Sequence, residues 1–337
     1  MSMVQAATKT VGDASSSSAL SPSVSIVIPV RNEEARIGHC LAAITKLDFT
    51  GRALDVVIVD NGSTDQTVAI AQGFADRLNL SILERPGVRI SALRNAGVAA
   101  SKGELVAFLD ADCIPASAWL SSAIDLMLRR GKVVIGSDYL IPPNSSWVAR
   151  AWYGSEPLPE LAPVSFVPSG DLLVSRAVFN EIGGFNESIQ TNEDCEFCLR
   201  ARMAGFPVYA ASSVAVVHLG TPQTLLQFFQ KNVWHGTHVF RVFRKNAATM
   251  QNAKPLAFAA YTLLASLGIL SGAGLAIATR KFAVLAVSAV ALICGPVLLA
   301  THKAVQQKRV ANILPLTALF LLYGFARAIS LLKPANW

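Results

Sequence analysis

The chain carries no acidic residue after Glu196. All 22 Asp and Glu residues fall within residues 1–196, together with 15 Lys and Arg, whereas residues 197–337 hold 14 Lys and Arg and no acid. The acid-free part is also the more apolar one, which excludes a simple soluble basic domain of the kind that binds nucleic acid. A basic, apolar segment is typical instead of a protein that lies on and in a membrane.

The chain also lacks a cysteine framework and an apolar leader. Its five cysteines are odd in number and scattered, so no set of disulfides is expected. Residues 1–22 are rich in Ser and Ala without an apolar run, and we expect a disordered tail rather than a signal peptide. The domain that follows is then expected to stay in the cytoplasm with reduced thiols.

From residue 24 to residue 109, short apolar runs alternate with stretches of helical spacing. Apolar β-branched runs predict strands, and apolar residues three or four positions apart predict helices. The expected strands are 24–30, 54–59, 80–83 and 105–109, and the expected helices are 32–46 and 90–100. This alternation predicts an α/β fold with a mostly parallel, Rossmann-like sheet. Ligands of such sheets bind beyond the carboxyl ends of the strands.

The last third contains three long runs with almost no charge. Residues 255–279 and 282–301 have none, and residues 311–332 have only Arg327. About 20 apolar residues are enough to cross a bilayer, so three transmembrane helices are expected within residues 255–337. A buried helical hairpin is the alternative. Lys and Arg gather on the side that faces the first domain, which favours a cytoplasmic domain at the cell (inner) membrane.

Residues 223–254 separate the two parts. Within them, residues 225–243 combine many apolar side chains with interspersed Lys and Arg, which is too much charge for a membrane span. The pattern favours an amphipathic helix that lies in the bilayer interface. The alternative is an amphipathic helix that packs within the protein.

Two acidic motifs stand where chemistry is expected. Asp110 and Asp112 follow the apolar strand 105–109, and two carboxylates there can bind one hard cation such as Mg²⁺ or Mn²⁺. A solvated turn is the alternative. Glu193 and Asp194 begin a helical run, where carboxylates cap the helix and meet its dipole. A carboxylate there can also act as a general base toward a hydroxyl group.

Four sequence blocks between residues 23 and 222 resemble a known family. They are VSIVIPVRNE at 24–33, VIVDNGSTDQT at 57–67, SALRNAGVAASKG at 91–103 followed by FLDAD at 108–112, and GGF at 183–185 followed by Glu193-Asp194. In this order they resemble the family 2 glycosyltransferases of the GT-A fold. The resemblance implies a transferase that uses a nucleotide diphosphate sugar together with Mg²⁺ or Mn²⁺.

The resemblance also implies roles for individual residues on the donor side. The nucleotide pocket would be formed by Pro29, Arg31, Glu33, Asp60, Arg94 and Asn95. Within it, Asp60 would recognise the base, and Arg94 and Asn95 would lie beneath the nucleotide. The metal and diphosphate site would consist of Asp110, Asp112 and His218, with Asp112 the more direct ligand. His218 follows the strand-like run 214–217, and a buried histidine without metal is the alternative.

On the acceptor side, the resemblance implies that Asp194, next to Glu193, deprotonates the acceptor in an inverting transfer. Gly170 and Asp171 fall where the family lines the sugars. Residues 138–166, rich in proline and aromatic side chains, break the strand–helix rhythm where an acceptor would approach. Their aromatic side chains would stack on sugars, reach toward lipid, or pack as an ordinary loop.

One departure from the family bears on the product. Processive polysaccharide synthases of this family carry Q-x-x-R-W, and residues 230–234 read QKNVW, with Val233 in place of Arg. This departure favours the transfer of a single sugar to a membrane lipid or lipid-linked acceptor. The alternatives are a processive synthase or export component, and an inactive membrane scaffold of the same fold.

Overall fold

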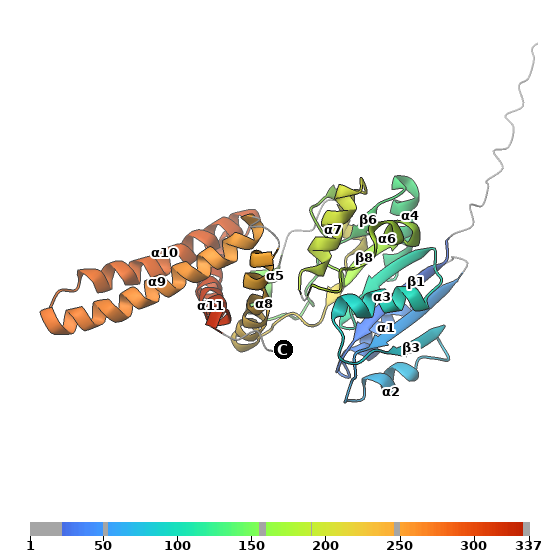
Figure 1. The fold of residues 1–337 in the computed structure, drawn as a ribbon, viewed down its shortest axis with the longest axis horizontal. Helices are drawn as coiled ribbons and strands as arrows, with labels where there is room; N and C mark the ends of the chain where they lie inside the picture. The colour runs from blue at the N-terminus through green and yellow to red at the C-terminus, as the bar shows by residue number, and fades with distance from the viewer. Residues whose placement is uncertain (1–21, 50–52, 155–159, 190, 246–249, 333–337) are drawn as a thin grey trace, which may run out of the picture.

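A computed structural model of the chain describes residues 22–49, 53–154, 160–189, 191–245 and 250–332. The expected tail, residues 1–22, lies outside these ranges except for Pro22. The described residues form an α/β domain up to residue 218 and a helical part from residue 225 onward, and the two parts meet end to end (Figure 1).

A large sheet forms the centre of the α/β domain. Its strands, in spatial order, are β3 (Leu80–Glu84), β2 (Leu54–Asp60), β1 (Val24–Val30), β4 (Leu105–Leu109), β8 (Asp171–Ser175), β6 (Val134–Gly136), β9 (Val208–Ala210) and β7 (Ala162–Pro163). The first four pair in parallel, whereas β8 lies antiparallel between β4 and β6. The mostly parallel sheet confirms the fold class expected from the sequence. Every residue of β1 is buried, as its apolar run predicts.

Helices pack on both faces of this sheet. On one face lie α1 (Ile37–Ile44), α2 (Thr67–Gln72) and α4 (Trp119–Arg130), and on the other lie α3 (Ile90–Ala100), α6 (Arg176–Ile182) and α7 (Glu193–Met203). Alternate side chains of β1 divide between the two cores, with Ile26 and Ile28 in one and Val27 in the other. This division follows from the two-residue repeat of a strand.

Two elements differ from the sequence-based expectation. The first helix begins at Ile37 instead of residue 32, because Asn32 has a left-handed backbone (φ 53°) and its side-chain oxygen accepts a hydrogen bond from the Thr64 N–H at 2.8 Å. The strand-like run 214–217 is divided between the 3₁₀ helix Ser212–Val214 and the short strand β10 (Val217–His218). Within the domain, β10 pairs antiparallel with β5 (Cys113–Ile114).

The helical part of the described chain consists of α8 (Leu225–Lys245), α9 (Met250–Thr279), α10 (Ala283–Gln306), the 3₁₀ turn Val310–Asn312 and α11 (Ile313–Leu332). Three stretches, one in each of the last three helices, are long and apolar enough to cross a membrane, which agrees with the three runs of almost no charge. In Figure 1, α9 and α10 extend side by side away from the α/β domain, whereas α8 and α11 lie together nearer to it.

The segment between β6 and β7 ties the two parts together through α5 (Trp147–Tyr153). The ring centroid of Trp152 lies 4.8 Å from those of Phe228 on α8 and Phe320 on α11, and 5.5 Å from that of Tyr323. The sequence leaves three roles for the aromatic side chains of this segment: stacking on sugars, reaching toward lipid, or packing within the protein. Trp152 packs within the protein. The α/β domain is therefore held against the helical part by side-chain contacts as well as by the chain itself.

Helix α8 has one packed face and one exposed face. Phe228 and Val233 are buried, whereas Leu226 and Trp234 are 64% and 58% exposed. The helix thus packs within the protein on one side and presents large apolar side chains among polar glutamines on the other. Such an outer surface is what a helix in the bilayer interface needs.

The packing of α3 on the sheet leads to a stability prediction. A Cβ on Gly97 would come within 2.3 Å of Cγ1 of Val27 and 3.1 Å of Cγ2 of Val59. We expect Gly97→Val to lower the free energy of unfolding by about 1–3 kcal/mol, because an overpacked core is strained. Denaturant unfolding followed by tryptophan fluorescence measures this loss. Ala99→Val, at an exposed position of the same helix, is the control and should cost only about 0.5 kcal/mol; equal losses would contradict the prediction.

Candidate active site

Three segments that are distant in the sequence converge at one edge of the sheet. They are the end of β2 with Asp60, the loop between β4 and β5 with Asp110 and Asp112, and the end of β10 with His218. Because β1, β2 and β4 are parallel neighbours, their carboxyl ends lie along the same edge. The pairing of His218 with Cys113 in the small β5–β10 sheet then brings His218 beside Asp112.

A buried arginine joins the two acidic motifs. Arg94 on α3 is 2% exposed; its Nη2 donates to Oδ1 of Asp110 at 2.8 Å and its Nη1 donates to Oε1 of Glu193 at 2.9 Å. Burial alone would lower the pKa of Arg94, but the two carboxylates hold it above its ordinary value. The Asp-x-Asp loop and the start of α7 are thereby held side by side.

Asp112 lies in a recess that a glycine leaves open. Its Oδ2 is 3.5 Å from Nε2 of His218, whose ring stacks on that of Tyr139. A Cβ on Gly220 would come within 2.1 Å of the same Oδ2. Burial lowers the pKa of His218 by more than Asp112 raises it, so the ring is neutral at pH 7 and can offer a nitrogen lone pair.

Asp112 and His218 are the described residues whose chemistry fits a divalent cation. Magnesium and manganese ions accept a carboxylate or two from a protein and complete their coordination with water and phosphate oxygens. No cluster of three or more His, Cys, Asp or Glu side chains suited to a metal occurs in the described ranges. A cation here would take further ligands from a phosphate-bearing substrate. Oδ1 of Asp110 is already engaged by Arg94.

Asp194 stands at the start of α7. Its Oδ1 accepts a hydrogen bond from the backbone N–H of Cys195 at 2.7 Å. Burial, and then the carboxylate of Glu193, raise the pKa of Asp194 from 3.8 to about 6. A carboxylate of this kind is ionised at neutral pH yet accepts a proton readily, as a general base must. Glu193, by contrast, accepts hydrogen bonds from Arg94 and from Ser169 at 3.1 Å.

Asp60 is 3% exposed, and its carboxylate accepts hydrogen bonds from the turn that follows it. Its Oδ2 accepts the backbone N–H groups of Gly62 and Ser63, each at 2.9 Å, and its Oδ1 accepts the hydroxyl of Ser63. The carboxylate therefore shapes the turn after β2. A nucleotide base at this position would share Asp60 with these donors.

The other expected pocket residues follow the end of β1. Pro29 is buried in the strand, Arg31 is exposed just beyond it, and Glu33 is half-buried. Oε2 of Glu33 accepts a hydrogen bond from Arg36 at 2.6 Å. Burial raises the pKa of Glu33 by more than Arg36 lowers it, and the carboxylates of the Asp-x-Asp loop add to the increase. Glu33 thus lies within the electrostatic field of that loop.

Asn95 has both ends of its amide occupied. Its Oδ1 accepts the backbone N–H of Phe185 at 2.9 Å, and its Nδ2 donates to the carbonyl of Phe185 at 2.8 Å and to Oε1 of Glu187 at 2.9 Å. These bonds fix the Gly-Gly-Phe block, residues 183–185, against α3. The structure therefore places the Asn95 amide on this block and not free toward a nucleotide.

Gly170 and Asp171 have different surroundings. A Cβ on Gly170 would come within 2.2 Å of Oδ2 of Asp110, so glycine leaves this carboxylate its space. Asp171 is fully buried and accepts the indole N–H of Trp119 at 2.9 Å, and burial raises its pKa well above the ordinary range. We expect Asp171 to support the strand beneath the Asp-x-Asp loop and not to touch a sugar.

Lys231 on α8 is a site residue that the sequence motifs do not single out. Its Nζ donates to the carbonyl oxygen of Gly220 at 3.4 Å, at the edge of the Asp112 recess. Burial lowers the pKa of Lys231 against the attraction of Asp112 and Asp110. A signal was present in residues 230–234, where the cation of the family motif is missing but a lysine stands two positions earlier.

The sequence matches a known family over the segments that form this site. The model of "Glycosyl transferase family 2" matches residues 25–183. Glycosyltransferase AglE of Haloferax volcanii is 30% identical over 207 residues, which cover 60% of this chain and 68% of that protein. The chain belongs to glycosyltransferase family 2, which confirms the resemblance of the four blocks.

Other relatives match less of their own length. Pre-mycofactocin glycosyltransferase of Mycobacterium tuberculosis is 28% identical over 193 residues, and validoxylamine A glucosyltransferase of Streptomyces hygroscopicus is 26% identical over 224 residues. The matches cover 54% and 56% of this chain but only 39% and 49% of those proteins. The chain therefore spans less than half the length of these two relatives.

A solved structure shares the fold over most of the chain. Mannosyltransferase PcManGT from Pyrobaculum calidifontis, solved in complex with GDP-Man and Mn²⁺, aligns with a TM-score of 0.57 at 19% identity. The alignment covers 91% of this chain and 87% of that one. Together with the family match, it confirms the expected GT-A fold.

Removal of Arg94 should destabilise the site, because two carboxylates would lose their shared cation. We expect Arg94→Met to lower the free energy of unfolding by about 3–5 kcal/mol, the usual effect of removing one partner of a buried ion pair. Urea unfolding in detergent measures it. The control is Arg129→Met, whose pair with Asp125 on α4 is exposed and contributes less than about 1 kcal/mol. If both substitutions have the same effect, Arg94 does not hold the site together.

Proposed function

We propose that the protein is a membrane-anchored glycosyltransferase that moves a single sugar from a nucleotide diphosphate sugar to a membrane lipid or lipid-linked acceptor. The observation that carries this proposal is the pair of contacts from Arg94 to Asp110 and Glu193, at 2.8 and 2.9 Å. They hold a candidate diphosphate and metal loop beside a candidate base. Family membership supplies the reaction class.

On the donor side, Asp112 and His218 are the residues that would hold Mg²⁺ or Mn²⁺, and Lys231 adds a positive charge next to them. The chemistry that such a cation supplies when bound is neutralisation of the charge that grows on the leaving diphosphate. Support for both the donor class and the ion comes from PcManGT, which was solved with GDP-Man and Mn²⁺. The nucleotide would lie along the ends of β1 and β2, over Glu33 and Asp60.

On the acceptor side, Asp194 is the candidate base. Glu193 is occupied by Arg94, so the carboxylate that remains available is that of Asp194. Asp194 would take the proton of the acceptor hydroxyl as its oxygen attacks the anomeric carbon. The bond from that carbon to the diphosphate breaks on the opposite face, and the configuration inverts.

Membrane anchoring is supported by the three helices of transmembrane length and by the outer face of α8. The positive charges of the helical part favour a cytoplasmic α/β domain. Single-sugar transfer is supported by Val233, an apolar residue that is 6% exposed and stands where the processive synthases of the family carry Arg. Lys231 is a cation of α8 that reaches the site.

Two substitutions separate the assigned roles. Asp194→Asn should reduce sugar transfer by about 10²–10⁴-fold while donor binding is kept, because an amide cannot accept the proton. Asp112→Asn should reduce transfer by about 10²-fold or more and abolish its stimulation by Mg²⁺ or Mn²⁺. Release of nucleoside diphosphate from a panel of sugar donors, measured in membranes, tests both. Asp125→Asn, on the exposed side of α4, is the control. Unchanged release in both site variants would falsify the roles.

The raised pKa of Asp194 gives transfer a pH dependence of definite sign. The base must be ionised, so the rate should fall as the pH drops through about 6. Stability should change in the opposite sense: the contribution of protonated Asp194 is complete below pH 3.8 and is lost as the pH rises through about 6. Rate and unfolding profiles of the wild type and Asp194→Asn test this. If the Asn variant keeps both profiles, another group is responsible.

A further inference from the structure

Arg327 is a partly buried cation for which the helical part contains no counter-ion. It lies on α11 in an otherwise uncharged run, and its Nε and Nη1 atoms are buried without a hydrogen-bond partner among the described residues. Residues 197–337 contain no Asp or Glu. An unpaired guanidinium is costly in apolar surroundings, so this position calls for an anion from outside the helices.

Helix α8 packs against Arg327, and its His235 lies in the field of both Arg327 and Lys231. A Cβ on Gly236 would come within 3.3 Å of Cδ of Arg327, so the two helices are in close contact here. Burial, with the charges of Lys231 and Arg327, lowers the pKa of His235 to about 4. Lys231 lies one helical turn before His235, on the same side of α8, and reaches the candidate active site at Gly220. Arg327 and Lys231 thus both act on the neutral His235, and Lys231 also reaches the candidate active site.

On the other side of Arg327, the same face of α11 lines an apolar pocket. Phe320 and Tyr323 precede Arg327 by seven and four positions, which places the three on one face of the helix. The guanidinium carbon lies 4.9 Å from the ring centroid of Tyr323. The pocket has a volume of about 570 Å³, and its apolar lining includes Trp152, Phe258, Tyr261, Leu299, Phe320 and Tyr323.

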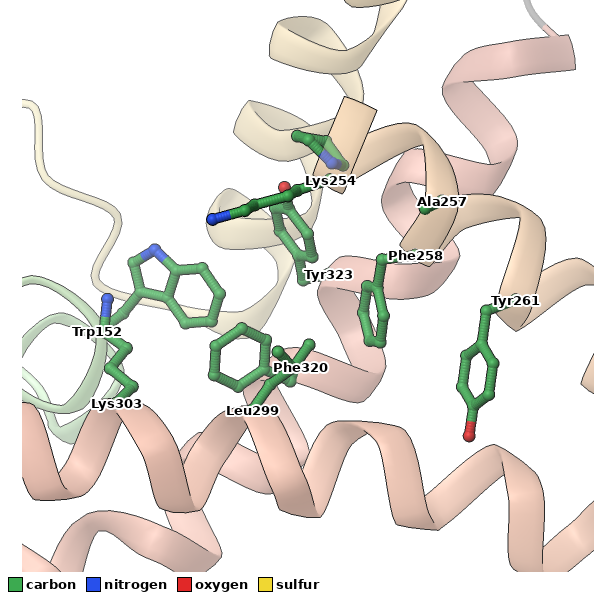
Figure 2. Close-up of a pocket in the computed structure, with 10 residues that line it drawn as sticks. Trp152, Lys254, Ala257, Phe258, Tyr261, Leu299, Lys303, Phe320 and Tyr323 are labelled. Carbon is green, nitrogen blue, oxygen red and sulfur yellow. The ribbon is translucent and has the colours of Figure 1, made fainter. Parts of the chain in front are cut away.

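The pocket combines this lining with positive charge at one side. Lys254 and Lys303 are its charged residues, and no carboxylate lines it among the described residues. The amino group of Lys303 lies 4.7 Å from the Trp152 ring. Figure 2 shows the side chains of both lysines toward the Trp152 side of the pocket, and Tyr261 on the opposite side. The site therefore matches an amphiphile with an anionic head.

We propose that this junction binds the phosphate group of a lipid acceptor, with Arg327 on the phosphate and the aromatic pocket around the adjoining hydrocarbon chain. The inference rests on the proposed transfer to a membrane acceptor and names the class of that acceptor as a lipid phosphate. A guanidinium binds phosphate through two parallel hydrogen bonds. The phosphate supplies the counter-ion that the helices lack, and Lys231 lies between it and the active site.

The unpaired guanidinium of Arg327 and the apolar pocket together favour a lipid phosphate over other ligands. A neutral lipid would fill the pocket but leave Arg327 unpaired. A soluble phosphate would pair with Arg327 but leave the apolar pocket unused, and burial of an apolar chain contributes favourably for each Å² removed from water. A lipid phosphate satisfies both.

Binding to the full chain in phosphatidylcholine nanodiscs tests the proposal. The probe is polyprenyl phosphate, compared with uncharged polyprenol, phosphatidylglycerol and inorganic phosphate. The wild type should bind polyprenyl phosphate preferentially, and Arg327→Gln should weaken that binding about 10- to 100-fold. Arg327→Lys should keep part of the affinity, since it retains the charge but not the fork of donors. Equal affinity for polyprenol, phosphatidylglycerol or inorganic phosphate would overturn the proposal.

Two controls exclude a structural role. Lys281→Gln removes an exposed charge between α9 and α10, at the end of the hairpin far from α11, and should leave the affinity unchanged. Without lipid, Arg327→Gln should lower the unfolding temperature only slightly, because the contact with the Tyr323 ring is lost but no described ion pair is broken. A fall as large as that caused by Arg94→Met would reveal an ionic partner within the chain and overturn the proposal. Glu156 is an acid that follows α5 in the sequence and lies outside the described residues. Its role as a counter-ion of Arg327 is tested by the unfolding temperatures of Glu156→Gln and of the double variant.

Failure of this inference can be told apart from failure of the proposed function. If the wild type transfers sugar to polyprenyl phosphate and Arg327→Gln has the same KM for that lipid, the function stands and the lipid site is wrong. If calorimetry detects no binding of any nucleotide sugar to the wild type, the function is wrong, whichever lipid binds at Arg327.

Discussion

The geometry of the site depends on one buried guanidinium. Arg94 meets carboxylates that lie 16 and 99 residues away along the chain, and it is almost completely shielded from water. A charge in such surroundings is stable only while its partners remain in place. The Asp-x-Asp loop and the start of α7 are therefore fixed relative to each other. Asp112 and Asp194 each lie within two residues of a partner of Arg94, so their positions follow from this bridge.

Around the bridge, the site is opened by the absence of side chains. The backbone of Gly170 lies against one carboxylate of the Asp-x-Asp loop, and that of Gly220 lies against the other; a Cβ would come within 2.2 and 2.1 Å of these oxygens. Any larger residue would displace a carboxylate that Arg94 and His218 hold from the other side. The two glycines thus complement the charges, because they leave both carboxylates the space in which to meet a ligand.

The sequence predicts those features whose causes are local. A β-branched run is enough to indicate a buried strand, and acids directly after it are enough to indicate a site at the strand end, as with Asp110 and Asp112. The bridge from Arg94 to Glu193 has no local signature, because it depends on how α3 and α7 pack on the same face of the sheet. The approach of Lys231 to the site likewise depends on the docking of α8, which the spacing of residues along one helix does not determine.

The division of charge along the chain gains a physical meaning where the two parts meet. The α/β domain gathers carboxylates at one edge, and the helical part has cations without a single acid. Lys231 of α8 reaches the acidic edge, while Nε and Nη1 of Arg327, farther into the helices, have no hydrogen-bond partner among the described residues. In the proposed reaction, the excess of carboxylates in one part and the excess of cations in the other are each balanced by a substrate and not by the protein.

A divalent cation that arrives with the donor diphosphate neutralises the carboxylates, and an anionic lipid neutralises Arg327. Binding of donor and acceptor would therefore both remove unbalanced charge, and the contacts of Trp152 with Phe228 and Phe320 join the domain that holds one excess to the helices that hold the other.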